Sequence, residues 1–136
     1  DLKLTRLAGE SFSLITGLDL AYLDLEVKPP ENFESGPTDD PEDEDVSLDE
    51  DGDLPWPDAA KTRAWWDAHA AQFTNGSRYF MGAPLSPAHC VQVLKDGCQR
   101  QRIAAALHRC LLQPGTKLFN CAAPAWRQKR WLETLA

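Results

Sequence analysis

Carboxylate side chains crowd one stretch of the chain, between Asp39 and Asp53. Ten of these fifteen residues are Asp or Glu, and none is Lys or Arg. Carboxylates at this density suit three kinds of chemistry: coordination of a hard cation such as Ca²⁺, long-range attraction of a basic partner, and solvation of a flexible spacer. The residues that flank the carboxylates help to distinguish these three possibilities.

A calcium loop can be laid over residues 47–58. With Gly52 at the sixth position of an EF-hand loop, carboxylates fall at the third, fifth and seventh positions. However, Ser replaces the leading Asp, Asp replaces the bidentate Glu, two prolines stiffen the exit, and no helix is expected before the loop. Calcium on Asp49, Asp51 and Asp53 is therefore an alternative hypothesis.

The cysteines and histidines do not form a recognisable metal or redox motif. The sequence has four cysteines but no CxxC pair, so it contains neither a zinc ribbon nor a thioredoxin-like motif. We expect free, buried or half-buried thiols, and hence a reducing compartment. A zinc site built from Cys90, Cys98 and His108 is a further alternative.

The sequence also lacks the usual signatures of catalysis, namely G-x-S-x-G, HExxH and a glycine-rich phosphate loop. His89 and Cys90 are neighbours, but adjacent residues on a helix point about 100° apart and cannot form a nucleophile–base pair. We expect a protein that is not an enzyme and needs no cofactor. An enzyme of unrecognised type is the alternative.

Aromatic and basic residues alternate in "WRQKRW", residues 126–131, which is typical of a surface that stacks nucleic-acid bases. Arg100 and Arg102 add positive charge. The simpler interpretation is that Trp126 and Trp131 anchor a terminal helix while the bases stay solvated or meet the acidic segment. The net charge of −7 also argues against broad nucleic-acid binding, so direct binding is not expected.

Charge divides the chain into two opposite halves. Residues 1–58 hold three bases against 18 acids, a net charge of −15, whereas residues 59–136 hold 11 bases against three acids, a net charge of +8. Such a chain can neutralise itself or offer opposite faces to partners. No stretch approaches the roughly 20 apolar residues of a membrane span, and no signal-peptide pattern is present, so we expect no membrane association.

Apolar residues at helical spacing indicate the elements that must position these charges. In residues 2–17 they place Leu4, Leu7 and Ile15 on one face of a helix, and Gly17 stands where a C-cap falls. Residues 18–27 form a short strand or an extended linker. Residues 28–58 hold six prolines among the acids, and we expect a long loop there without regular structure.

Further helices are expected after Asp58, a suitable N-cap for residues 59–73. Ser86 and Pro87 begin the next helix, which ends before Gly97. A third helix covers residues 98–113, and a short terminal helix covers residues 124–136. The expected core side of the third helix consists of Ile103, Ala104, Leu107 and Leu111.

The sum is an all-α fold of helical hairpins with one long, acidic, proline-rich loop and little or no strand. We divide it into residues 1–17, the last helix of a preceding helical region; residues 18–58, an extended linker and acidic loop; and residues 59–136, a helical C-terminal domain. The chain begins in what reads as the middle of a helix, so we expect a piece of a longer protein.

Ion pairs alone cannot order the acidic loop. Fixing each residue costs about 1–2 kcal/mol of chain entropy, whereas a surface ion pair returns about 0–1 kcal/mol. Apolar anchors are needed, and the acids are punctuated by Phe33, Val46, Leu48, Leu54 and Trp56. The pattern indicates a segment pinned at several points with its carboxylates outward. A solvated spacer is the alternative.

Several motifs together resemble the C-terminal region of a proteobacterial family with HEAT-like helical repeats, some of whose members are encoded in type VI secretion gene clusters. They are "LAGESFSLITGLDL", "GPTDDPEDEDV", "DLPWPD", "GSRYFMG" and "QRQRIAAAL". The resemblance covers about residues 5–132 and implies a HEAT-like N-terminal end. It also implies a scaffold or partner-binding protein, such as an immunity protein or adaptor for a secreted toxin.

The sequence therefore predicts a non-enzymatic protein-binding module of the bacterial cytoplasm. Its partner would be a basic protein, for instance a secreted nuclease toxin whose phosphate groove the carboxylates occupy. The residues predicted to bind the partner are Asp39, Asp40, Glu42, Asp43, Glu44, Asp45, Asp49, Asp51, Asp53 and Trp56.

Overall fold

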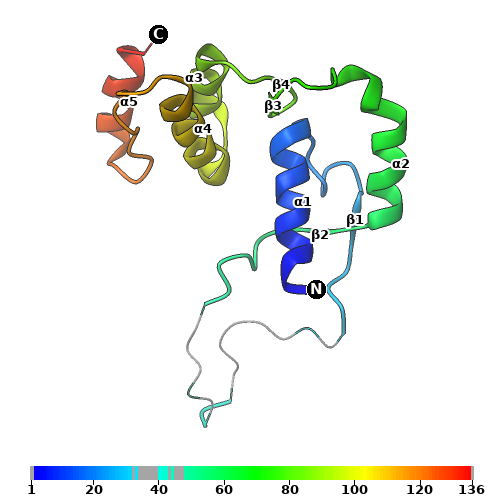
Figure 1. Ribbon diagram of the computed structural model, residues 1–136. Helices are drawn as coiled ribbons and strands as arrows, with labels where there is room; N and C mark the ends of the chain where they lie inside the picture. The colour runs from blue at the N-terminus through cyan, green and yellow to red at the C-terminus, as the bar shows by residue number, and fades with distance from the viewer. Residues whose placement is uncertain (1, 32, 34–39, 43, 45–47, 136) are drawn as a thin grey trace. The chain divides into compact units, whose positions relative to one another are not determined.

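Helices dominate the computed structural model, which describes residues 2–31, 33, 40–42, 44 and 48–135 (Figure 1). The five α-helices of this described part are α1 (Leu2–Thr16), α2 (Ala59–His69), α3 (Pro87–Asp96), α4 (Gln99–Leu112) and α5 (Ala125–Glu133), and a 3-10 turn, η1 (Ala70–Gln72), follows α2. The strands are β1 (Glu26–Val27), β2 (Trp56–Pro57), β3 (Tyr79–Phe80) and β4 (Ala83–Pro84). The predicted mainly helical fold is confirmed, while its HEAT-like character stays a prediction.

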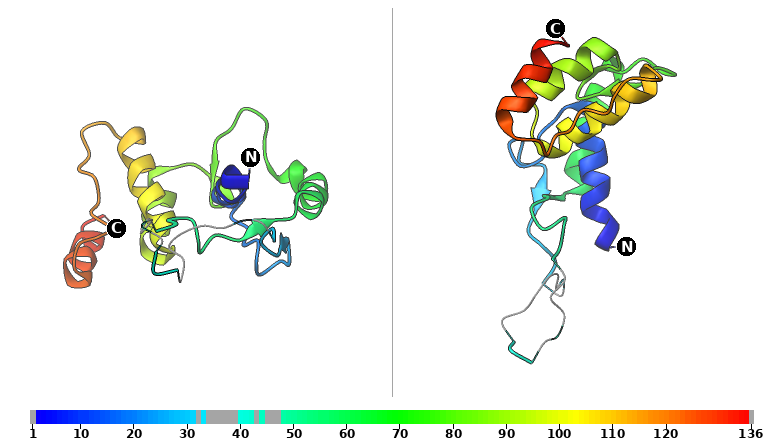
Figure 2. Two further views of the ribbon diagram at one scale, coloured as in Figure 1. Left: turned by 90° about the horizontal axis from the view of Figure 1, so that it is seen from below. Right: turned by 90° about the vertical axis from the view of Figure 1, so that its left-hand side faces the viewer.

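The chain forms two compact units, residues 1–75 and 76–136. The first contains α1, α2, η1 and the β1–β2 pair, and the second contains the β3–β4 pair and the last three helices. The helices of each unit can be followed in both views of Figure 2.

The first unit is built around aliphatic residues that follow α1. Leu18, Leu20 and Leu25 are buried together, with Phe12 of α1 and Trp65 of α2 packed against them. The Phe12 and Trp65 rings meet edge to face, with their centroids 5.8 Å apart. Aromatic pairs in this geometry stabilise packing beyond the area they bury.

The buried side of helix α1 is not the side on which its apolar residues gather. Leu4 and Ile15 are 57% and 49% exposed, whereas Gly9 and Arg6 are buried. The cause is close approach: a Cβ on Gly9 would stand 3.0 Å from both Leu20 and Pro57. Glycine allows these neighbours to touch the helix, and the predicted apolar face is left at the surface.

The ends of the first unit's helices follow the predicted capping chemistry. Gly17 has a φ of +76°, and its amide donates to the Ser13 carbonyl at 2.8 Å, as a helix C-cap requires. The Asp58 carboxylate accepts hydrogen bonds from the amides of Ala60 and Lys61 at 2.9 and 3.0 Å. Both predicted caps are confirmed.

A short strand pair joins the two sides of the acidic segment. β1 and β2 are antiparallel, with Val27 opposite Trp56, and the Asp58 amide donates to the Leu25 carbonyl at 2.8 Å. The expectation that residues 28–58 hold no regular structure is therefore wrong at β2. An edge strand tolerates Pro57 because that residue's missing N–H is not required there.

The second unit is a helical hairpin of α3 and α4 with α5 beside it. Ser86 caps α3 by accepting from the His89 amide at 3.1 Å, and Pro87 occupies the first turn, as predicted. Cys90 and Leu94 are fully buried. A Cβ on Gly97, between the helices, would stand 2.7 Å from the Val93 carbonyl oxygen, so the hairpin needs glycine there.

Helix α4 packs through alanines, and its predicted core side is wrong. Ala105 and Ala106 are 0% and 3% exposed, whereas Ile103, Leu107 and Leu111 are 46%, 50% and 73% exposed. Small side chains allow two helix backbones to approach closely. Ala105 and Ala106 are therefore the buried residues of α4, and its aliphatic residues lie at the surface.

Only one of the two predicted tryptophan anchors holds α5 in place. Trp131 packs on Phe119 with ring centroids 5.1 Å apart, and the side-chain Nε2 of Gln128 donates to the Cys121 carbonyl at 3.0 Å. Trp126 is 61% exposed and lies against Arg127.

All four cysteines are free thiols. Cys90 and Cys121 are buried, and burial raises the pKa of both thiols, so they stay protonated and unreactive at neutral pH. Cys110 is half-buried, and Cys98, contrary to expectation, is exposed. No helix in the described ranges combines the length and apolar character that crossing a bilayer requires.

The packing of His108 predicts a pH dependence of the second unit's stability. His108 packs on Phe80 with ring centroids 4.8 Å apart, and burial, aided by Arg78, lowers the imidazole pKa below its ordinary value. The unfolded chain therefore binds this proton more readily. The neutral His108 side chain therefore makes its full contribution to the stability of the folded protein above the unfolded pKa of about 6.5. This contribution is lost as the pH falls towards the folded pKa.

We expect the urea unfolding free energy to fall from about pH 7 to about pH 5.5, and to fall less steeply in His108→Gln. His69→Gln, which alters a histidine of the first unit, is the matched control. Equal pH slopes for the wild type and His108→Gln would contradict this assignment.

Candidate protein-binding surface

One buried cation holds the end of the acidic segment on the first helix. Arg6 of α1 is 5% exposed. Its Nη2 atom lies 2.7 Å from Asp49 Oδ2, and its Nη1 atom donates to the Asp51 carbonyl oxygen at 2.8 Å. A buried guanidinium needs such partners, because an uncompensated charge away from water is costly.

Two aromatic rings complete the surroundings of this guanidinium. The Arg6 Cζ atom lies 5.0 Å from the centroid of the Phe33 ring and 5.2 Å from that of Trp56. The two rings meet edge to face at 4.7 Å. Cation–π attraction is strongest where water is excluded, and Trp56 is only 7% exposed. We call Arg6, Phe33, Asp49, Asp51 and Trp56 the Arg6 cluster.

The backbone at Asp49 is folded to present its carboxylate. Asp49 Oδ1 accepts from the Asp51 amide at 3.0 Å, and the Asp49 carbonyl accepts from the Gly52 amide at 3.1 Å. The Leu54 amide donates in turn to the Asp51 carbonyl at 3.0 Å. These successive turns, typical of Asp and Gly, lead the chain into β2.

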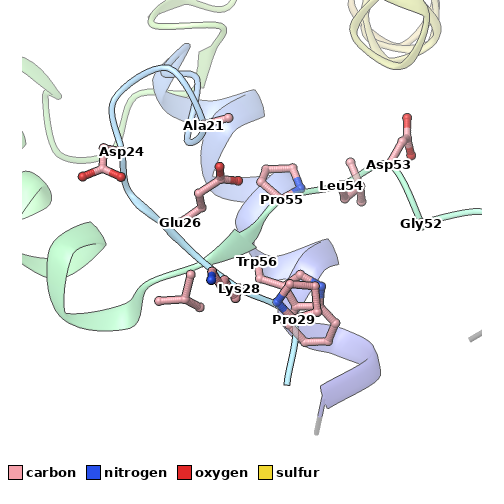
Figure 3. A pocket seen from close by; sticks show the side chains of 11 residues that line it. Ala21, Asp24, Glu26, Lys28, Pro29, Gly52, Asp53, Leu54, Pro55 and Trp56 are labelled. Carbon is pink, nitrogen blue, oxygen red and sulfur yellow. The ribbon is translucent and has the colours of Figure 1, made fainter. Parts of the chain in front are cut away.

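A pocket of about 570 Å³ lies beside this turn, between residues 21–29 and 52–56 (Figure 3). Its charged side chains are Asp24, Glu26, Lys28 and Asp53. The Asp24 carbonyl oxygen accepts from Lys61 Nζ at 2.7 Å. Acids outnumber bases three to one among the charged lining side chains, but Lys61 Nζ, 3.3 Å from Asp24 Oδ2, offsets one of these acids.

The residues predicted to bind a partner divide into two groups. Asp40, Glu42, Glu44 and Asp53 are exposed. Asp49 and Asp51 are half-buried and Trp56 is buried, all three in the Arg6 cluster. The remaining predicted residues, Asp39, Asp43 and Asp45, lie outside the described residues. The inner group attaches the chain at residues 49–56 to α1, and the outer group is exposed to solvent.

The residues of the calcium hypothesis have other partners. The Asp49 carboxylate faces Arg6, and the Asp58 carboxylate caps α2, while Ser47 lies outside the described residues. No group of three Asp, Glu, His or Cys side chains suited to hold a metal ion occurs in the part of the chain that the structure describes.

The residues of the zinc hypothesis are engaged separately. Cys90 is buried in α3, Cys98 is exposed at the start of α4, and His108 packs on Phe80. His89 Nε2 lies 2.8 Å from the Phe80 carbonyl oxygen, which it can reach as a donor.

Sequence reasoning missed Arg6, the residue that organises the surface. The sequence carries no clear signal for it, because the helix holds two bases, Lys3 and Arg6, and Glu10 stands four positions beyond Arg6. A carboxylate at that spacing is an ordinary partner for a base on the surface of a helix. The pairing with Asp49 therefore depends on the tertiary fold.

Comparison of the chain with protein-family models, curated proteins and solved structures finds no match. The surface is therefore interpreted from its own geometry.

Removing the guanidinium should release the segment. In Arg6→Met, Asp49 loses its cation while remaining 17% exposed, so we expect a loss of about 2–4 kcal/mol in unfolding free energy. Hydrogen exchange of the Gly52 and Leu54 amides should accelerate more than that of α3. The control Arg63→Met breaks the exposed pair with Asp67 and should cost under about 1 kcal/mol. Equal costs would contradict a special role for Arg6.

Proposed function

We propose that this chain is a non-enzymatic protein-binding module that docks a basic protein on its acidic segment, residues 39–53. The Arg6 cluster carries the proposal, because it gives one end of the segment a fixed anchor on a helix. A solvated spacer needs no buried cation, whereas a docking surface gains from being positioned before its partner arrives.

Charge supplies the attraction. The exposed carboxylates Asp40, Glu42, Glu44 and Asp53 belong to a unit in which acids greatly outnumber bases. Such a surface attracts a basic protein over about a Debye length, ~8 Å at physiological salt. The main effect is on the rate of encounter, because individual surface ion pairs are worth little.

The family resemblance suggests the class of partner. In the proposed setting the module acts in the bacterial cytoplasm as an immunity protein or adaptor for a secreted toxin. With a nuclease toxin, the carboxylates would stand where substrate phosphates bind, and binding would occlude the nucleic-acid groove. Arg and Lys side chains that normally hold phosphates would then hold Asp and Glu.

Neutralising the outer carboxylates should slow association. The partner is first captured with the intact chain and identified by mass spectrometry. For Asp40→Asn/Glu42→Gln/Glu44→Gln, we expect its association rate in stopped flow to fall about tenfold at low salt, with a flatter salt dependence. The dissociation rate should change less.

The matched control is Asp67→Asn/Asp96→Asn/Glu133→Gln, which makes the same change in net charge outside the segment. If the two triple variants slow association with the partner to the same extent, the net charge of the chain rather than the segment attracts the partner. The proposed docking surface is then wrong.

A further inference from the structure

An apolar groove runs along the first unit, apart from the acidic segment. It has a volume of about 1020 Å³ and is lined by residues of α1, α2 and the end of β2. Its largest apolar side chains are Phe12 and Ile15 of α1, Trp66 of α2, and Pro57. Ile15 is 49% exposed, so a substantial aliphatic surface faces water in a concave place.

Contacts between aromatic rings of the protein itself fix part of the shape of the groove before any ligand binds. Phe12 meets Trp66 edge to face with centroids 6.1 Å apart, and Trp66 stacks on Phe73 at 5.3 Å. These ring contacts fix one side of the groove, and most of the other lining residues are small, including Ala8 and Ala59. A fixed aromatic side next to small side chains leaves room for bulky side chains of another molecule and allows its backbone to come close.

Its electrostatic surroundings define the occupant. The only charged side chain in the described lining is Arg63, which pairs with Asp67 at 3.1 Å. The unit around it, residues 1–75, holds 19 acids against five bases, a net charge of −14. Ten of these acids lie in residues 39–53, and the other nine still outnumber the five bases by four. An apolar groove on a unit with this excess of acids favours a ligand with an apolar face and positive flanks.

We propose that this groove binds an amphipathic basic helix of a partner protein. Anchors at positions i, i+3 or i+4, and i+7 enter the groove, and flanking Lys or Arg side chains face the acidic unit. The inference deepens the proposed function by assigning the partner's apolar anchors a separate site. It rests on that function only for the sign of the flanking charge.

A designed peptide probes the groove directly. The probe is an 18-residue Leu/Lys peptide with leucines at i, i+3, i+4 and i+7; the comparison peptide has the same composition in an order that breaks this spacing. We expect the periodic peptide to bind the intact chain about tenfold more tightly or better, the affinity equivalent of one additional buried aliphatic side chain. A periodic Leu/Glu peptide should not bind.

Nuclear magnetic resonance locates the site. The indole N–H signal of Trp66 and the methyl signals of Ile15 should shift when the periodic peptide is titrated into the protein. The midpoint of this titration should agree with the dissociation constant of the peptide. If neither signal shifts, the peptide binds elsewhere and the proposal is overturned. A concentration-dependent dimer without peptide, with the same signals shifted, would also overturn it by making a second copy the occupant.

Two groove variants and two matched controls complete the test. Ile15→Asp puts a charge on the apolar wall and Ala59→Trp fills the groove, so each should weaken binding about tenfold or more. Leu7→Asp and Ala68→Trp change partly exposed residues of the same two helices outside the lining and should bind like the wild type. Circular dichroism establishes that each variant is folded.

The experiments distinguish a failure of the groove proposal from a failure of the proposed function. If the groove variants bind the periodic peptide as the wild type does, the groove proposal fails whatever the segment does. If Asp40→Asn/Glu42→Gln/Glu44→Gln leaves partner association unchanged while Ile15→Asp abolishes peptide binding, the docking role of the segment fails and the groove stands.

Discussion

The first unit depends on compensating the charge of the buried Arg6 guanidinium, whose two Nη atoms have partners while its Nε atom has no hydrogen bond within the described part of the chain. Arg6 can leave water only because a carboxylate, a backbone carbonyl and two aromatic rings surround it, and these groups come from three separate parts of the sequence. Meeting this requirement brings residues 33 and 49–56 to α1. β2 then pairs with β1, and Asp58 is placed to begin α2. A local need for charge compensation thus organises elements far apart in the chain.

The two units stabilise the packing of their helices in different ways. In the first, aromatic rings and an ion pair stabilise helices whose aliphatic residues are largely exposed. In the second, α3 and α4 pack through Cys90, Leu94 and small alanines. The first unit therefore combines a charged segment with an apolar groove, the two features on which the proposed recognition of an amphipathic partner rests.

Local chemistry was predictable from the sequence, and packing partners were not. The caps at Gly17, Asp58 and Ser86 follow from short-range hydrogen bonding, which depends on residues within one helical turn. The buried face of α4 depends on how closely another helix approaches, which the spacing of apolar residues does not encode. For the candidate surface, the anchoring roles of Phe33 and Trp56 agree with the prediction, whereas Leu48, another predicted anchor, is 79% exposed. The cation that holds Asp49 was not predicted, because 43 positions separate it from Asp49.

The Arg6 cluster clamps the chain on both sides of the most acidic run, through Phe33 before it and Asp49 after it. The entropy of closing a loop between two fixed points grows only with the logarithm of its length, so even a doubling costs about 0.6 kcal/mol. Selection can therefore lengthen, shorten or rewrite the intervening residues with little penalty to the scaffold. The clamp thus separates changes in the sequence of the intervening residues from changes in the stability of the unit.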